Sequence, residues 1–437
     1  MNLTVTHSES ASTKEIQGAI DTCFLAGGGT VRIEDGEYRI DSIRLRSNVT
    51  LYLTAGVRLV ATRDIEAYDI LSDDTVEPLP EDEKCDVLWV RSSLERDNSF
   101  FKKAGSRWSR AIIRLVYAEN AKIIAEAGAI IDGSNSFDEI GEEHYRGVHG
   151  ISMYHCKNLE FSGYTIQDTG NWAHCAYDCQ GLSFHDITVL AGHDGVHFSS
   201  CDDISVERCE MYTGDDCVAG FDIYNLTVRN CLFNTACSSF RLGGTKITIV
   251  DCKLVGPPRF CFRGSLTKEE KRAGAPSQTG RKTTLSAFTY YSDFTLNVRH
   301  APSEIVMRRC SFENLERFLH FNFSGNERWQ LNRPLEEITF EDVTATNVGM
   351  SLCAYGGEEH PVSLTMKNCR FSFASEQTEL IRAANFAEIT LDGVCAEGVQ
   401  GNAVKSWGGN GALTVRDCEG FSDGITEATE VFTCKPI

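Results

Sequence analysis

The sequence is short of basic residues and of long apolar runs. Its 437 residues hold 42 Lys and Arg against 62 Asp and Glu, which gives a formal net charge of −20. A surface of this sign repels phosphate backbones, so nucleic acid is not an expected partner. The apolar runs, such as positions 111–113, are far below the roughly 20 residues that a membrane-spanning helix needs. A membrane is therefore not an expected partner either.

The features of a secreted or zinc-binding protein are also missing. Positions 1–7 (MNLTVTH) contain neither a basic stretch nor an apolar one, so no secretory signal is visible. The sequence has 18 cysteines, but no two of them form the CxxC pair that is typical of structural zinc sites. We therefore expect a cytoplasmic protein with mostly buried, reduced thiols, and with no metal, cofactor or disulfide framework.

What the sequence does have is a repeat. Short runs that alternate apolar and polar residues, the pattern of a strand with one buried face, follow one another at positions 158–162, 181–185, 203–207, 225–229 and 246–250. Similar runs resume at 305–308, 338–341, 364–367, 389–392 and 413–416. Cysteines keep the same period, as Cys156, Cys179 and Cys201 illustrate.

This period predicts an all-β parallel solenoid with about 21–23 residues per coil. Leucine-rich repeats have similar periods, but the recurrent leucines that they need are missing. In a solenoid, equivalent residues of successive coils stack about 4.8 Å apart. The cysteines are then interpreted as small apolar units of an internal ladder.

We expect one domain over positions 1–437. The helical spacing of positions 13–21 and the glycines at 27–29 predict a helix over 13–27 that caps the open end of the solenoid. Two segments break the period, 72–110 and 257–302, and we interpret them as loop insertions near a cleft.

Several segments resemble a known family. The runs 19–31, 36–38, 43–51, 115–120, 131–133 and 171–174 are similar to polygalacturonases of glycoside hydrolase family 28. The resemblance covers most of positions 13–255 and, more loosely, 303–346. It implies a single-stranded right-handed parallel β-helix that hydrolyses glycosidic bonds with inversion, using three aspartates.

The family's motifs are kept only in part. Its Asn-Thr-Asp-Gly motif aligns with Gly192–Gly195, which retains Asp194, and its Gly-Asp-Asp motif is intact at Gly214–Asp216. Its Gly-His-Gly motif aligns with Ala236–Ser238, which has no His, and its Arg-Ile-Lys motif has only a basic counterpart at Arg259–Gly264. The resemblance thus implies Asp194, Asp215 and Asp216 as catalytic residues and a divergent substrate specificity.

The residue spacing supports the same three aspartates. Asp194 precedes Asp215 and Asp216 by one period of the repeat, so they should lie on adjacent coils and line one solvent-accessible groove. Carboxylates this close cannot all ionise without cost, which provides a proton donor beside a base, as glycoside hydrolysis requires. The alternative is that each Asp merely caps backbone N–H groups at a coil turn.

Residues around the aspartates and one coil to either side are the expected substrate contacts. These substrate-binding candidates are Trp172, His174, His193, Ser238, Arg241 and Arg263. Trp172 could equally be a core residue, and the arginines could equally form salt bridges on the acidic surface. The role of His193 stays open, because alternation should turn it away from the face that Asp194 uses. His197, which also flanks Asp194, is interpreted as an ordinary surface or core histidine.

The leading hypothesis is a glycoside hydrolase that removes units from one end of a neutral or singly charged oligosaccharide. One alternative is a β-helix lyase or epimerase, in which the acidic cluster holds Ca²⁺ and Arg263 acts as the base. Another is a non-catalytic carbohydrate-binding β-helix.

Overall fold

The computed structural model describes residues 1–7, 13–70, 107–139, 145–191, 193–262, 266–273, 283–290, 299–300, 303–324, 334–409 and 411–428. The chain divides into two compact units, which are treated separately below. The first comprises Met1–Asp215 and Phe260–Ser277, and the second comprises Asp216–Arg259 and Gln278–Ile437. The expected single domain over 1–437 stays a prediction.

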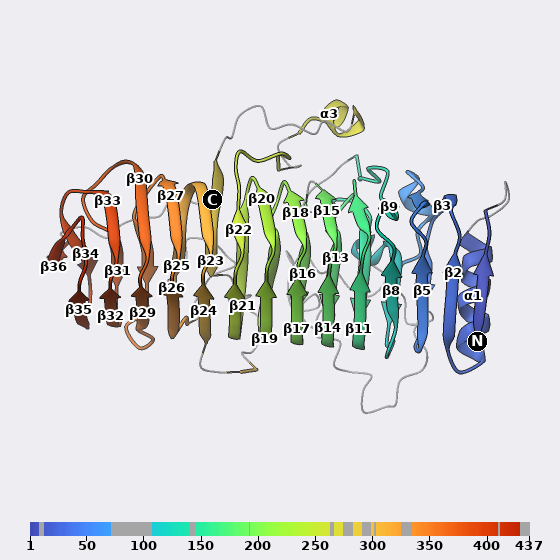
Figure 1. Ribbon diagram of the computed structural model, residues 1–437, viewed down its shortest axis with the longest axis horizontal. Coiled ribbons are helices and arrows are strands. Elements are labelled where there is room, and N and C mark those ends of the chain that lie inside the picture. The colour runs from blue at the N-terminus through green and yellow to red at the C-terminus, as the bar shows by residue number, and fades with distance from the viewer. Residues whose placement is uncertain are drawn as a thin grey trace. The chain divides into compact units, whose positions relative to one another are not determined.

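The first unit consists of short strands with few helices (Figure 1). Its helices are α1 (Thr13–Leu25), η1 (Ile65–Ala67), η3 (Arg107–Ser109) and α3 (Lys268–Ala273). Its strands up to position 132 are β1 (Asn2–Val5), β2 (Gly29–Ile33), β3 (Gly36–Ile40), β4 (Ile43–Leu45), β5 (Val49–Leu53), β6 (Val57–Ala61), β7 (Ala111–Val116), β8 (Lys122–Ala125) and β9 (Ile130–Asp132). The remaining strands are β10 (His149–Tyr154), β11 (Lys157–Ser162), β12 (Thr165–Gln167), β13 (His174–Tyr177), β14 (Gln180–His185), β15 (Thr188–Ala191), β16 (Val196–Ser199), β17 (Asp202–Glu207) and β18 (Glu210–Thr213).

Each coil of this unit adds one strand to each of three parallel ladders. One ladder runs β8, β11, β14 and β17, and in it Leu159 pairs with Leu182, which pairs with Ile204. These buried residues recur at the interval that the sequence period predicts. Phe161 and Phe184 stack inside the coils with ring centroids 4.9 Å apart. The predicted all-β, right-handed parallel β-helix is confirmed.

The chain turns between strands at residues with left-handed backbone conformations. Asn120 and Asn158 both have φ near 55°, a region that Asn tolerates better than most residues. Their amides also stack: Asn158 Nδ2 donates to Asn120 Oδ1 at 3.3 Å, and Asn120 Nδ2 donates to Asn48 Oδ1 at 3.1 Å. The same corner is thereby repeated from coil to coil.

Most of the cysteines within the described ranges are buried, as predicted. Cys156, Cys179 and Cys201 are buried free thiols, and each donates its S–H to the carbonyl oxygen two positions earlier, at 3.2–3.3 Å. The backbone N–H of Cys156 in turn donates to the Cys179 sulfur at 3.3 Å. These thiols therefore form an internal ladder.

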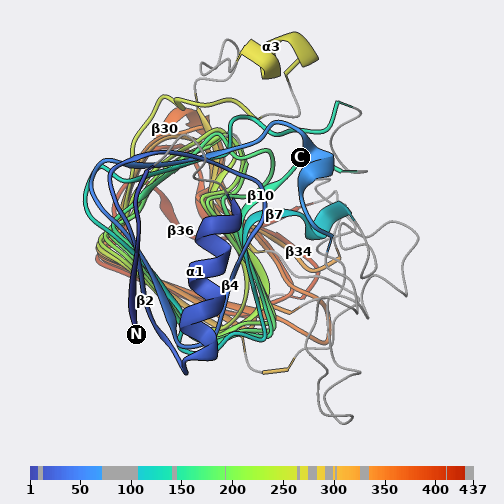
Figure 2. The same ribbon diagram turned by 90° about the vertical axis from the view of Figure 1, so that its right-hand side faces the viewer.

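Helix α1 lies across the first coil of the first unit (Figure 2). It buries Ile16, Ile20 and Cys23, which are spaced as one face of a helix requires. The helix ends at Leu25, where glycines with positive φ begin at Gly27. It covers apolar side chains that an open β-helix end would expose to water.

The second unit continues with longer strands. These are β19 (Val218–Arg229), β20 (Leu232–Thr235), β21 (Ser238–Val250), β22 (Lys253–Leu254), β23 (Thr284–Tyr290), β24 (Glu304–Arg308), β25 (Ser311–Asn322), β26 (Glu337–Glu341), β27 (Thr344–Val348) and β28 (Leu352–Tyr355). They are followed by β29 (Val362–Lys367), β30 (Arg370–Gln377), β31 (Ile381–Ala384), β32 (Phe386–Asp392), β33 (Cys395–Val399), β34 (Asn402–Trp407), β35 (Ala412–Arg416) and β36 (Ser422–Glu427).

The coil length changes within the second unit. Leu226 pairs with Ile247, at the predicted interval. Later partners in the same ladder are farther apart along the chain, at positions 338, 364, 389 and 413. The predicted coil length therefore holds between about positions 158 and 250, whereas the coils before and after that range differ in length. Later coils accommodate extra residues in their corners while the buried strand positions stay in register.

Much of the two predicted insertions lies outside the described residues, so their place near a cleft stays a prediction. Within the described part of the chain, no helix is long and apolar enough to span a bilayer.

Candidate active site

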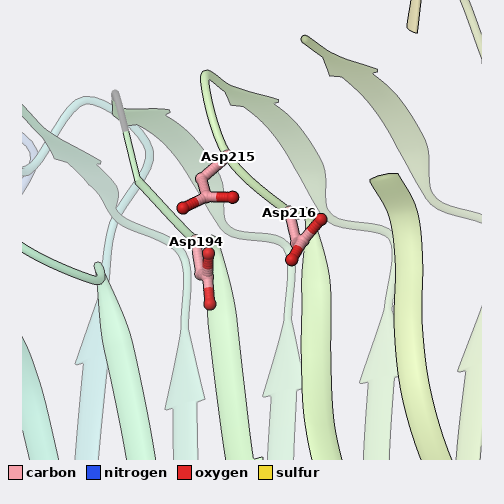
Figure 3. A group of neighbouring side chains, drawn as sticks. All are labelled: Asp194, Asp215 and Asp216. Atoms are coloured by element: carbon pink, nitrogen blue, oxygen red, sulfur yellow. The ribbon is translucent and has the colours of Figure 1, made fainter. Parts of the chain in front are cut away.

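The three predicted aspartates lie together at the starts of two successive strands. Asp194 comes just before β16, and Asp215 and Asp216 lie between β18 and β19. One carboxylate oxygen of each lies within 4.8 Å of the others, and Figure 3 shows the three carboxylates gathered at this edge. All three residues are largely buried, with 3–7% of their surface exposed. The solvent-accessible groove that the three aspartates are expected to line stays a prediction.

Hydrogen bonds at the coil turns fix these positions. The hydroxyl of Thr213 donates to the carbonyl of Asp215 at 2.7 Å. In the second unit, the backbone N–H of Ser238 donates to Oδ1 of Asp216 at 3.0 Å. Ser238 thus contacts the cluster through its backbone, although sequence analysis proposed it as a substrate contact.

Arg146 brings a positive charge into the cluster. Its Nη1 lies 3.2 Å from Oδ2 of Asp215 and 3.5 Å from Nδ1 of His193, and the side chains of Arg146 and Asp215 are only 8% and 10% exposed. A buried charge pair of this kind is strongly coupled, because water does not compensate either partner. Sequence analysis missed Arg146, which lies outside every family motif and outside the repeated strands.

His193 lies at the same edge. Besides Arg146 it contacts Phe262, whose ring centroid is 6.5 Å away in an edge-to-face arrangement. Its predicted role as a substrate contact stays open. Its position beside Arg146 corrects the expectation that strand alternation turns it away from the aspartates.

His197 also belongs to the cluster, against the expectation of an ordinary core or surface histidine. Its Nδ1 lies 2.9 Å from Oδ2 of Asp194, and both side chains are almost completely buried. The imidazole stacks on Trp172 with ring centroids 4.0 Å apart and an interplanar angle of 6°. Trp172, which was predicted to bind substrate, is only 4% exposed and instead packs against the face of the His197 ring.

Further aromatic rings pack around Trp172. His149 lies 5.2 Å from Trp172 and 6.2 Å from Trp108 between ring centroids. Burial lowers the pKa of His149 to about 3, so the imidazole is neutral at physiological pH.

His174 is not a substrate contact. Its Nε2 lies 2.9 Å from the Tyr164 hydroxyl and its Nδ1 lies 3.0 Å from the Gly195 carbonyl oxygen, so both ring nitrogens have partners in the core. Burial lowers its pKa to about 4. His174 pairs in register with Ile151 and Val196, which are inward-facing positions. The structure therefore gives it a core role in place of the predicted one.

The two arginine candidates have different outcomes. Nη1 of Arg241 lies 3.6 Å from Oδ2 of Asp216, and its side chain is 26% exposed, so it is both near the cluster and within reach of a ligand. Arg263 lies outside the described residues, and its predicted contact is untested.

The three carboxylates could also hold a hard cation, since oxygen ligands of this kind suit Ca²⁺ and Mg²⁺. Two guanidinium groups, those of Arg146 and Arg241, already lie beside two of the three carboxylates. They supply part of the compensating charge that a cation would otherwise provide.

Comparison with known proteins agrees with this geometry. Residues 100–237 match the family "Glycosyl hydrolases family 28", and this segment contains all three aspartates. The resemblance to glycoside hydrolase family 28 is confirmed. A probable polygalacturonase of Vitis vinifera is 25% identical over 236 residues, which span 50% of this chain and 43% of that protein.

A solved structure extends the likeness in fold to the whole chain. Polygalacturonase from Erwinia carotovora ssp. carotovora superposes with a TM-score of 0.52 and covers 99% of this chain and 96% of its own, at 14% identity. At that identity the likeness shows the fold and leaves the substrate undecided.

Proposed function

We propose that the protein is a glycoside hydrolase that cleaves an oligosaccharide by acid–base catalysis with Asp194, Asp215 and Asp216. The observation that carries the proposal is the meeting of these three carboxylates within 4.8 Å, inside the segment that matches family 28. Acid–base hydrolysis of a glycosidic bond requires a protonated carboxyl group and an ionised one on either side of the bond.

The roles follow the motif resemblance and the contacts. Asp215 donates a proton to the leaving oxygen, and Asp194 and Asp216 position and deprotonate the attacking water. Arg146 stabilises the negative charge that remains on Asp215 after proton transfer. His197 holds the Asp194 carboxylate in one orientation.

Two finer features of the proposal are the stereochemistry and the mode of attack on the chain. Inversion is taken from the family resemblance. Carboxyl groups of inverting enzymes are typically about 6.5–9.5 Å apart, and shorter separations are typical of retaining enzymes. Here one carboxylate oxygen of each aspartate lies within 4.8 Å of the others, which is shorter than the inverting range. Measuring which anomer is released first therefore decides between inversion and retention. Action from one chain end rests on the insertions at 72–110 and 257–302, which would close a groove into a pocket.

A calcium-dependent lyase is the second candidate, since the same three carboxylates suit a calcium ion. The two candidates differ in their response to metal. A hydrolase that uses the aspartates as acid and base keeps its activity in a chelator and is inhibited by bound Ca²⁺, whereas the lyase gains activity with Ca²⁺. Saturable binding of saccharides without turnover in either condition would favour the non-catalytic β-helix.

We also propose a reducing compartment such as the cytoplasm. The 16 cysteines within the described ranges are free thiols, and most are buried in the coils. Counting accessible thiols in the denatured protein as isolated tests this proposal, since 18 titratable thiols are expected.

The experiment that tests the function is a screen of neutral and singly charged oligosaccharides and aryl glycosides, followed by NMR of the first anomer released. Hydrolysis with one anomer formed initially supports the proposal and fixes inversion or retention. An unsaturated product would instead show a lyase.

A further inference from the structure

Arg317, on strand β25 of the second unit, is a buried cation without a counter-ion. Only 6% of the residue is exposed. Among the residues that the structure describes, no ion pair or hydrogen bond involves its guanidinium group, and its Nε and Nη1 atoms are buried without a partner. Arginine keeps its charge in proteins, so loss of a proton cannot relieve this burial.

One unpartnered hydroxyl lies beside Arg317. Ser286 of β23 pairs in register with Arg317, so the two side chains leave neighbouring strands, about 4.8 Å apart, on the same face. Ser286 is completely buried, and its hydroxyl oxygen has no hydrogen-bond partner within the described ranges. The next pair on that face, Phe288 with Leu319, is apolar and completely buried, so it offers no acceptor. Arg317 and Ser286 therefore form a small buried polar site.

The donors of this site decide the sign of its ligand. A guanidinium group has five N–H donors and no acceptor, and the Ser286 hydroxyl adds an O–H donor. Water would accept these hydrogen bonds but would leave the positive charge uncompensated, whereas buried charges in proteins are paired. A metal ion would be repelled by the guanidinium group. The missing partner of Arg317 is therefore an anion.

Burial limits the size of this anion. Ser286 has no exposed surface and Arg317 is 6% exposed, so a sugar ring would have to displace packed side chains to reach the buried donor atoms. A monatomic ion needs a space only about as large as a water molecule occupies. A single negative charge also matches the single guanidinium group.

We propose that Arg317 and Ser286 bind a small inorganic monoanion, namely chloride. The inference goes beyond the proposed function and does not rest on it, because a protein without hydrolase activity would bind the ion equally well. The ion accepts hydrogen bonds from both side chains and neutralises the buried charge, and it thereby links β23 to β25. The same register row continues to Ser238, whose backbone N–H donates to Asp216.

Thermal unfolding of the full chain in sodium salts of equal ionic strength tests the proposal. Chloride should raise the melting temperature above its value in methanesulfonate, whose anion is too large for the site. The rise should saturate at millimolar chloride, because an ion that binds only the folded state stabilises it by mass action. Bromide should act like chloride. Glucuronate should act like methanesulfonate, and this arm distinguishes an inorganic ion from a sugar acid.

Substitutions at the site assign the effect to these two residues. Arg317→Met should abolish the saturable chloride shift, and in methanesulfonate it should melt at the wild-type temperature or higher, because it loses an uncompensated buried charge. Ser286→Ala removes one donor and should raise the half-saturating chloride concentration several-fold. Arg309→Met is the matched control, since Arg309 pairs with Asp251 on the surface and should leave the shift unchanged.

Equal wild-type melting temperatures in chloride and methanesulfonate would overturn the proposal, as would a chloride shift of wild-type size in Arg317→Met. A glucuronate shift equal to the chloride shift would also overturn it, because the site would then be open to sugar acids. If Arg317→Met does not fold, Ser286→Ala decides: an unchanged half-saturating chloride concentration in that variant would contradict the assignment.

Discussion

The imidazole of His197 holds the carboxylate of Asp194, with Nδ1 2.9 Å from Oδ2. Both side chains are almost completely buried, so water cannot replace this contact. The stacking of Trp172 on the other side of the ring fixes the orientation of the imidazole. Asp194 is thereby held in one rotamer beside Asp215 and Asp216.

His197→Ala should lower kcat by about 10-fold to 100-fold, the effect of losing a hydrogen bond to a charged group. His197→Asn should restore part of the activity, because the Asn Nδ2 can occupy the place of the imidazole Nδ1 and donate to Asp194. Steady-state kinetics measure both, and KM should change little. His155→Ala is the control: His155 makes a similar contact with Asp178, at 2.8 Å. A loss of activity in His155→Ala equal to that in His197→Ala would contradict the positioning role.

Arg146 and Asp215 should prove energetically coupled. Arg146→Met leaves a buried carboxylate without its partner, which should lower the free energy of unfolding by about 3 kcal/mol. The double variant Arg146→Met/Asp215→Asn should recover much of that loss. A double-mutant cycle by urea denaturation measures the coupling. Strictly additive effects would show that the contact between the two side chains contributes nothing to stability.

Asp215→Asn should reduce turnover by about a thousandfold or more, because the variant cannot donate a proton to the leaving group. Its thermal midpoint should fall, because Arg146 is left buried without its counter-charge, although relief of the repulsion among the three carboxylates offsets part of that loss. Asp251→Asn, which alters an exposed partner of Arg309, controls for a general effect of lost charge. A fully active Asp215→Asn variant would remove Asp215 from the mechanism.

Much of this arrangement could be predicted from the sequence, because a β-helix repeats its register. Strands β11, β14 and β17 lie where the alternating runs predict them, and the interval between Asp194 and Asp215 equals one coil. Prediction of register from the repeat fails where the repeat is interrupted. Arg146 lies in a segment between repeats, so it could not be placed in register beforehand.

The histidines show a second limit. His174 and His197 lie on strands of successive coils, and the motif spacing alone does not reveal which of the two points inward. The register with Ile151 and Val196 decides that His174 belongs to the core. That signal was present in the sequence, as two apolar residues at the equivalent positions of neighbouring coils.

His174 should make stability depend on pH. Burial lowers its pKa in the folded state to about 4, whereas the unfolded chain has the usual value of about 6.5. Between these values the unfolded state binds the extra proton, so stability is greatest above pH 6.5 and falls as the pH is lowered towards 4. The slope from this group is about 1.4 kcal/mol per pH unit. His174→Phe should reduce the slope of stability against pH by the contribution of one proton. An unchanged slope would show that other groups cause the pH dependence.

Long polygalacturonate should be a poor substrate, despite the resemblance to polygalacturonases. A protein with a net charge of −20 repels a polyanion unless cations line the whole binding surface. The family's Gly-His-Gly and Arg-Ile-Lys motifs are not preserved here, since Ala236–Ser238 and Arg259–Gly264 stand in their places. Loss of charged or hydrogen-bonding contacts at a buried site can cost about 10⁴-fold in discrimination. Reducing-end assays on polygalacturonate and on a singly charged oligosaccharide should therefore differ by orders of magnitude in kcat/KM. Efficient hydrolysis of the long polymer at physiological ionic strength would show that the surface charge does not govern specificity.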